Sequence, residues 1–335
     1  MKRFVYLLII MSIISFCRAQ TNNDCGIPSK IQRTAPIADS SIGKNNINIS
    51  FPLLVKVFVH IVANDDGTGA AALDTAVMRQ MENMRQFYAE HSICFILVGV
   101  EQINSTDLNT QDADNEELEL SPYLIPNMVN IFVHSSLFGN NGSLNGNAYA
   151  IPNYYLSIVG SAVNSTTNIS TLAHEMGHVF GLLHTFQDRK DGDGNSIREN
   201  VARNGVCKNC ETEGDLICDT KADRNNDESV ISETNCTYLG TMLDACSAAL
   251  EMEPGNIMTY GRRSCRNHFT PGQGTRARAF LLSSIFLVNS LAEDDLLIFQ
   301  NTNFSSGRAN YAARNTISNI GNFSVSADAR VNVTS

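Results

Sequence analysis

The sequence has no long cluster of lysine and arginine, and its formal net charge is −10. Proteins that bind nucleic acid or an anionic membrane surface need a basic surface, so we expect neither kind of partner. The apolar run Phe4–Phe16 is also shorter than the roughly 20 residues that a membrane-spanning helix needs. It follows Lys2 and Arg3 and precedes the small residue Ala19. This pattern predicts a signal peptide over residues 1–19, and hence a secreted, extracellular protein.

Two alternatives to this signal peptide are weaker. A membrane anchor over the same run is disfavoured by its length. A lipid anchor on Cys17 is disfavoured because the bulky Phe16 stands where that signal prefers a small residue. Removing the signal leaves about 315 residues, enough for one large domain or two small ones. With 43% hydrophobic residues, the chain can bury a sizeable core.

The order of expected elements indicates the fold class. Residues 20–50 are polar and predict a flexible N-terminal segment or pro-segment. Apolar periodicity then predicts, in order, a strand at 51–62, a helix at 71–91, strands at 93–103 and 127–137, an edge strand at 148–151, a histidine-rich helix starting near 172 and a helix within 270–291. This order favours an α/β (α+β) fold, in which helices pack on a twisted sheet.

Cysteine is concentrated late in the chain. Six of the eight cysteines outside the signal peptide lie between residues 207 and 265. In an exported protein they predict disulfides that staple an irregular C-terminal subdomain, with a connectivity that spacing does not reveal. Cys207 and Cys210 form a single CxxC, so a structural bridge is favoured over a zinc ribbon or a redox pair. Residues 291–335 are Asn- and Ser-rich and form a tail of unknown role.

The stretch LAHEMGHVFGLLHTF, residues 172–186, carries the strongest chemical signal. His174 and His178 are four residues apart, so on a helix their imidazoles project from one face and can bind one Zn²⁺. Glu175 lies next to His174, where its carboxylate can reach water at the metal and act as a general base.

A third histidine can join these two only if the helix ends. His184 lies six residues after His178, which on a continuing helix is about 240° around the axis. Gly181 lies between them and permits the left-handed conformation that ends a helix sharply. Gly177, inside the helix, is expected to allow close packing near the metal. Three histidines without a fourth protein ligand leave a position for water, which predicts one catalytic zinc and the hydrolysis of peptide bonds.

The motif H-E-x-x-H-x-x-G-x-x-H, followed by NIMTY at residues 256–260, resembles the metzincin clan of zinc peptidases. The resemblance implies that Met258 forms a hydrophobic floor under the three histidines and that Tyr260 assists catalysis by binding the oxyanion.

Within this clan, the blocks GDLICDT, NIMTYGRRSC and HFTPGQGTRAR resemble the pappalysin-like (cytophagalysin) peptidases. The resemblance covers roughly residues 51–290 and implies a zinc metallopeptidase domain there, with an N-terminal sheet-and-helix subdomain above the cleft and an irregular subdomain below it. We expect a monomeric zinc endopeptidase that acts on protein or peptide substrates.

Two further expectations depend on this resemblance. Cys25, followed by glycine near the mature N-terminus, resembles the cysteine with which several metzincins keep themselves latent. A disulfide, for example with Cys94, is the alternative, and the number of cysteines does not decide between them.

The resemblance also implies a structural Ca²⁺ near residues 210–260, to which Asp215 or Asp219 could contribute. The acidic segment 188–196 could hold Ca²⁺ as well. It does not complete an EF-hand because Ser196 replaces the required glycine, so a solvated turn is favoured.

Two other classes of function remain open to the sequence. One is a catalytically silent binding or adhesive protein on the same fold, and the other is a zinc hydrolase that acts on a non-peptide bond. The intact Glu175 and the open coordination position favour the endopeptidase over both.

Overall fold

The computed structural model describes residues 52–140, 142–224 and 228–292, and the backbone of strands between 296 and 334. The predicted signal peptide, residues 1–19, and the predicted pro-segment with Cys25 lie outside the described residues. In the described part of the chain, no helix is long and apolar enough to cross a membrane.

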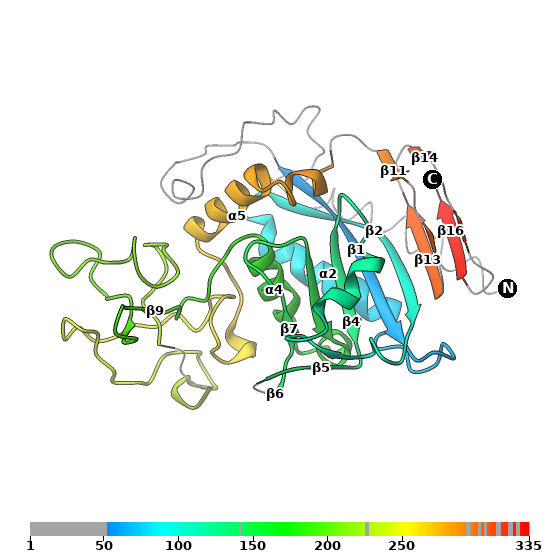
Figure 1. Ribbon diagram of the computed structural model, residues 1–335. Helices are drawn as coiled ribbons and strands as arrows, with labels where there is room; N and C mark the ends of the chain where they lie inside the picture. The colour runs from blue at the N-terminus through cyan, green and yellow to red at the C-terminus, as the bar shows by residue number, and fades with distance from the viewer. Residues whose placement is uncertain are drawn as a thin grey trace.

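A seven-stranded sheet in the order β16-β13-β2-β1-β4-β8-β7 is the scaffold of the molecule (Figure 1). Its central strands are parallel, and the short strand β7 runs antiparallel to β8 at one edge. The strands of the first half are β1 (Leu53–Ala63), β2 (Ile93–Asn104), β4 (Val129–His134), β7 (Gly146–Asn147) and β8 (Tyr155–Val159).

Strand β1 explains why the sheet is covered on both faces. From Leu53 to Ile61, every second residue packs into the main hydrophobic core. The alternate side chains point to the opposite face, where Val62 and Phe132 belong to a smaller cluster. A parallel strand that is buried on both faces has a nearly continuous apolar sequence, which is the pattern that predicted this strand. The strand expected at 51–62 is confirmed as β1.

Helices cover the face of the main core (Figure 1). They are α2 (Asp74–Ala89), α3 (Gly160–Asn164), α4 (Thr171–Val179) and α5 (Pro271–Ser283). All nine residues of α4 are buried. Helix α5 begins with a capping box between Thr270 and Gln273, and Asp219 also accepts hydrogen bonds from Thr270 Oγ1 and Gly272 N. The predicted helices at 71–91 and 270–291 are therefore confirmed, although each is shorter than expected.

The edge strand expected at residues 148–151 is wrong. Tyr149 has a left-handed φ of 59°, and Asn147 Oδ1 accepts a hydrogen bond from its backbone N–H. The side chain of Asn153 donates to Ala148 O, so the segment forms a turn. The edge strand is β7, two residues earlier, and β8 follows this turn.

The remaining elements are short. They are the strands β3 (Thr110–Asp112), β5 (Ser136–Gly139), β6 (Gly142–Ser143), β9 (Arg189–Lys190) and β10 (Ser196–Ile197), and the 3₁₀ helices η2 (Glu117–Tyr123), η3 (Glu228–Val230), η4 (Arg263–Cys265) and η5 (Val288–Ser290). Strands of the C-terminal part are β11 (Leu296–Gln300), β12 (Asn303–Phe304), β13 (Gly307–Ala312), β14 (Thr316–Ile320), β15 (Ser324–Val325) and β16 (Ala329–Thr334). Of these, β13 pairs antiparallel with β2, so the predicted tail adds strands to the sheet.

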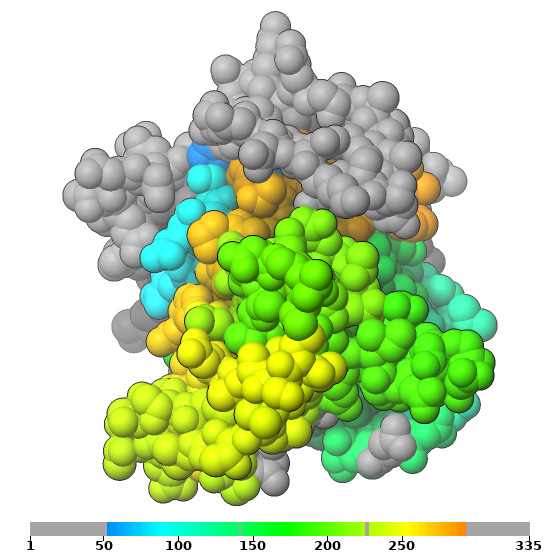
Figure 2. Space-filling view, turned by 90° about the vertical axis from the view of Figure 1, so that its left-hand side faces the viewer, coloured from blue at the N-terminus to red at the C-terminus, as the bar shows by residue number. Residues whose placement is uncertain are grey.

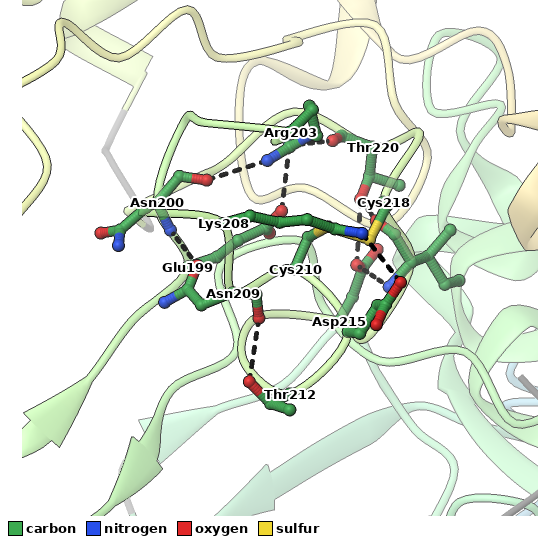
Figure 3. Close-up of a disulfide and its surroundings, with 12 residues drawn as sticks. Glu199, Asn200, Arg203, Lys208, Asn209, Cys210, Thr212, Asp215, Cys218 and Thr220 are labelled. Carbon is green, nitrogen blue, oxygen red and sulfur yellow. Dashed lines mark hydrogen bonds and ion pairs between the residues drawn. A yellow bond between two sulfur atoms is a disulfide. The ribbon is translucent and has the colours of Figure 1, made fainter. Parts of the chain in front are cut away.

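An irregular subdomain follows the histidine-rich helix and gathers on one face of the molecule (green to yellow in Figure 2). Three disulfides staple it: Cys207–Cys246, Cys210–Cys218 and Cys236–Cys265. The two cysteines of the CxxC thus pair with different partners. Figure 3 shows the Cys210–Cys218 bridge among polar side chains. The sheet, the helices and this stapled region confirm the predicted fold class.

Cys94 is also disulfide-bonded. Its partner is not among the cysteines of the stapled subdomain, which pair with one another.

Candidate zinc centre

Helix α4 places His174 and His178 one turn apart, and backbone carbonyls orient both rings. Nδ1 of His174 lies 2.8 Å from Ile257 O, and Nδ1 of His178 lies 2.8 Å from Leu182 O. A carbonyl oxygen can only accept, so both rings carry their proton on Nδ1. Each Nε2 therefore presents a lone pair, which is the arrangement that metal-binding histidines adopt.

The helix ends where the sequence predicts. Gly181 has a left-handed φ of +83°, and the Leu182 N–H donates to Gly177 O. A Cβ at position 181 would also overlap the ring of Phe280. The chain turns back at this point, and His184 Nε2 comes to lie 3.2 Å from His174 Nε2 and 3.0 Å from His178 Nε2.

The three histidines fit a zinc ion. Tetrahedral Zn²⁺ with Zn–N bonds of about 2.1 Å holds its nitrogens roughly 3.4 Å apart, close to these separations. Nε2 of His174 and Nε2 of His178 each present a lone pair towards His184. A proton on His184 Nε2 could form a hydrogen bond with only one of these two nitrogens. Burial lowers the pKa of all three rings, that of His184 to about 3, and keeps them in the neutral form that binds metal.

Met258 is fully buried and packs against helix α4. A Cβ on Gly177 would lie 2.5 Å from Met258 Sδ, so the glycine in the helix is needed for this approach. The residue before Met258 supplies the carbonyl that orients His174. Helix α4 and the turn at residues 256–260 thus fix each other's position.

Tyr260 lies at the rim of the centre, with its side chain half exposed. Its ring centroid is 4.6 Å from that of His184 and 5.8 Å from that of His174. Phe186 stacks on His184 at 4.6 Å, and its ring centroid also lies 4.7 Å from that of Tyr260. A phenol in this place can reach a substrate bound at the histidines.

Glu175 is buried, and burial raises the pKa of its carboxyl to about 8. Gly146 of the edge strand β7 lies against it, and a Cβ there would come within 2.5 Å of Glu175 Cγ. The sequence alone does not mark Gly146 as a site residue, because a glycine in an Asn- and Gly-rich segment predicts only a loop.

Asp223 is a second residue that the sequence analysis missed. Its Oδ2 accepts hydrogen bonds of 2.7 Å from Thr185 Oγ1 and from Thr259 Oγ1. These threonines follow His184 and Met258 directly, so the buried Asp223 connects the third histidine to the turn beneath it. No local pattern distinguishes this aspartate from the other acidic residues of the irregular subdomain.

The expected calcium ligands have separate roles. Asp219 caps helix α5. In the segment 188–196, Asp191 accepts hydrogen bonds from the backbone of Asp193 and Asn195 in the hairpin β9–β10, so this segment forms a turn.

The chain is similar to known metalloproteases. Residues 55–229, slightly more than half of the chain, match the model of metallo-peptidase family M12. An extracellular metalloprotease of Podospora anserina is 26% identical over 68% of this chain and 73% of its own length. An extracellular metalloprotease of Pyricularia oryzae is 25% identical over 85% of this chain and 95% of its own length.

A solved structure, mirolysin in complex with compound 9, has a TM-score of 0.52 and 18% identity, and covers 72% of this chain and 96% of its own. This likeness concerns the fold alone and agrees with the expected metzincin-like architecture. The match to the family model includes the three histidines, and the alignments with the two extracellular relatives cover 68% and 85% of this chain. The chain therefore belongs to metallo-peptidase family M12 and is a metalloprotease, a hydrolase of peptides or proteins.

Proposed function

We propose that this metalloprotease is a secreted, monomeric zinc endopeptidase of the pappalysin-like (cytophagalysin) branch. His174, His178 and His184 would hold one Zn²⁺. The observation that carries the proposal is the convergence of the three Nε2 atoms, two of them with lone pairs, at the helix that also carries the buried Glu175. The names of the relatives support secretion.

Bound Zn²⁺ supplies a Lewis acid that polarises the scissile carbonyl and acidifies water. Glu175 accepts a proton from the attacking water and passes it to the leaving amine. Its buried carboxylate is held in one place by Gly146. Tyr260 donates a hydrogen bond to the oxygen anion that develops on the substrate. Met258 supports the helix from below.

Cleavage of a mixed peptide library tests this function. The purified mature chain is compared with Glu175→Ala and with a chelator-treated sample, and the zinc content of each is measured. We expect cleavage by the native chain alone, with zinc retained in Glu175→Ala. Tyr260→Phe should retain zinc and lose about 100- to 1000-fold in kcat, since it removes one oxyanion donor. If the native chain binds zinc but cleaves no peptide, the result would favour the alternative function, a catalytically silent binding or adhesive protein on the same fold.

We also propose a structural Ca²⁺ beside Asp215, which is 0% exposed (Figure 3). Its Oδ1 accepts hydrogen bonds from Ile217 N and Thr220 Oγ1, whereas the buried Oδ2 has no hydrogen-bond partner among the described residues. The carboxylate of Glu199 is also buried, and its pKa is raised to about 8 by burial and by the charge of Asp215. Arg203 Nη2 lies 2.9 Å from Glu199 Oε1 and neutralises part of the charge of this carboxylate. A bound cation would remove the remaining cost of burying these oxygens.

Thermal unfolding with Ca²⁺ or EGTA tests the calcium proposal. Ca²⁺ should raise the melting temperature of the native chain and leave that of Asp215→Asn unchanged. Equal melting temperatures of the native chain in Ca²⁺ and in EGTA would argue against the ion.

The latency role of Cys25 stays a prediction. Disulfide mapping of the intact chain tests it, since a disulfide at Cys25 would exclude a thiolate on the zinc.

A further inference from the structure

Arg266 is a buried cation beside the zinc centre. Arg266 is 8% exposed. Its Nε and Nη2 both donate hydrogen bonds to Gly261 O, at 3.1 and 2.8 Å. Gly261 directly follows Tyr260, the aromatic residue that contacts two of the histidines. The guanidinium is therefore fixed to the same loop that brings Tyr260 to the site.

The loop that carries Arg266 is rigid. Cys265 N donates to Arg262 O, and Arg266 N donates to Arg263 O, which closes a 3₁₀ turn over residues 263–265. Cys265 is also bonded to Cys236. A guanidinium held in this way loses little conformational entropy when it binds a ligand.

No carboxylate of the described residues pairs with Arg266. The neighbouring Arg262 has Glu228 and Glu233 within 4 Å, but no ion pair joins Arg266 to any acidic side chain in this part of the chain. Its Nη1 likewise donates no hydrogen bond to a described residue. Burial, and next the charge of Arg263, lower the pKa of Arg266 to about 10, so it stays cationic at neutral pH.

Arg266 and the catalytic residues also affect one another electrostatically. Its charge opposes the rise that burial causes in the pKa of Glu175 and of Tyr260. Glu228 and Glu175 stabilise the charge of Arg266 only from a distance. A buried cation without a direct ion pair costs free energy that an anionic ligand can recover. Guanidinium and carboxylate match in geometry, which makes a carboxylate the favoured ligand.

We propose that Arg266 determines substrate specificity by binding a carboxylate of the substrate close to the scissile bond. This inference rests on the proposed peptidase function. The carboxylate is either the side chain of an Asp or Glu residue or the free C-terminus of a short peptide. The first source makes the enzyme an endopeptidase selective for acidic sites, and the second favours cleavage near chain ends.

The test is a peptide library in which Asp or Glu is placed at each position around the cleavage site, with free and amidated C-termini in separate arms. The native chain should cleave acidic peptides preferentially, in the arm that corresponds to the carboxylate source. Arg266→Gln retains an N–H donor for Gly261 O and should lose about 10- to 100-fold in kcat/KM on those peptides, mainly through KM. Neutral peptides should be cleaved within about threefold of the native rate.

Three controls separate recognition from folding. Arg263→Gln removes an exposed arginine of the same loop and should keep the native preference. Arg266→Lys keeps the charge without the planar fork and should recover part of the preference. Binding of an acidic peptide to Glu175→Ala, measured by fluorescence anisotropy, should weaken when Arg266→Gln is added.

Cleavage without an acidic preference in the native chain would overturn the role of Arg266 and leave the peptidase function intact. An equal loss on acidic and neutral peptides in Arg266→Gln would also overturn it, because it would indicate a structural role. A native chain that cleaves no peptide would contradict both proposals.

Discussion

The carboxylate of Glu175 has little freedom because Gly146 packs against it from the edge strand. The two residues are distant in the sequence, and only the pairing of β7 with β8 brings this glycine to the catalytic helix. General-base catalysis requires the carboxylate to be placed accurately, and a displacement of about 1 Å can cost 100-fold in rate. Gly146 is thus a positioning residue for Glu175.

We predict that Gly146→Ala lowers kcat by about 10- to 100-fold while zinc content stays unchanged, because the new methyl group displaces Glu175 and leaves the histidines in place. Steady-state kinetics together with metal analysis checks this. Gly192→Ala is the matched control, since a Cβ there meets nothing within 4 Å. Zinc loss in Gly146→Ala, or equal kinetics in the two variants, would contradict the positioning role.

Among single residues, those that could be predicted are related by local geometry. The spacing of His174, His178 and His184 and the glycine exit describe one helix and one turn, so the sequence suffices to bring them together. Asp223 and Arg266 could not be predicted, because their positions depend on an irregular chain path and on disulfide pairings that spacing does not encode.

At the scale of elements, the exit of helix α4 is the feature on which the third histidine depends. We predict that Gly181→Ala destabilises the fold by about 2–4 kcal/mol, as the sum of left-handed strain and overlap with Phe280. Gly194→Ala has a similar φ of +82° in open space and should cost only about 1 kcal/mol. Denaturant unfolding of both variants measures the difference, and equal losses would show that packing against Phe280 is unimportant.

The elements themselves were predictable where one periodicity dominates. The continuous apolar run of β1 and the helical spacing of α2 are both confirmed. The strand expected at residues 148–151 failed because the side-chain amides of Asn147 and Asn153 bind the backbone and form a turn.

At the scale of the whole molecule, the second face of the sheet makes stability depend on pH. His134 is fully buried there, with Nδ1 2.6 Å from Leu108 O and Nε2 2.8 Å from Ser157 Oγ. Burial lowers its pKa from 6.5 to about 4. The folded state therefore favours neutral His134. This contribution is fully present above pH 6.5 and is lost as the pH falls towards 4, because the unfolded chain then binds a proton that the folded chain does not.

We predict that His134 accounts for about 3 kcal/mol of the stability lost between pH 7 and pH 4. His134→Gln should be less stable than the native chain at pH 7 and should have a flatter dependence on pH. Urea unfolding at a series of pH values, with zinc in excess, measures this. His268→Gln is the control, because the pKa of the partly exposed His268 is raised by Glu253 and its contribution has the opposite sign. An unchanged slope in His134→Gln would refute the prediction.

All nine residues of helix α4 are buried. Surface helices tolerate many substitutions on their outer side, but this helix has no outer side. Three of its positions carry the residues that we propose for chemistry, and Gly177 serves the approach of Met258. This helix therefore offers almost no room for neutral variation, and changes in substrate preference within such a protein have to arise in the loops that surround it.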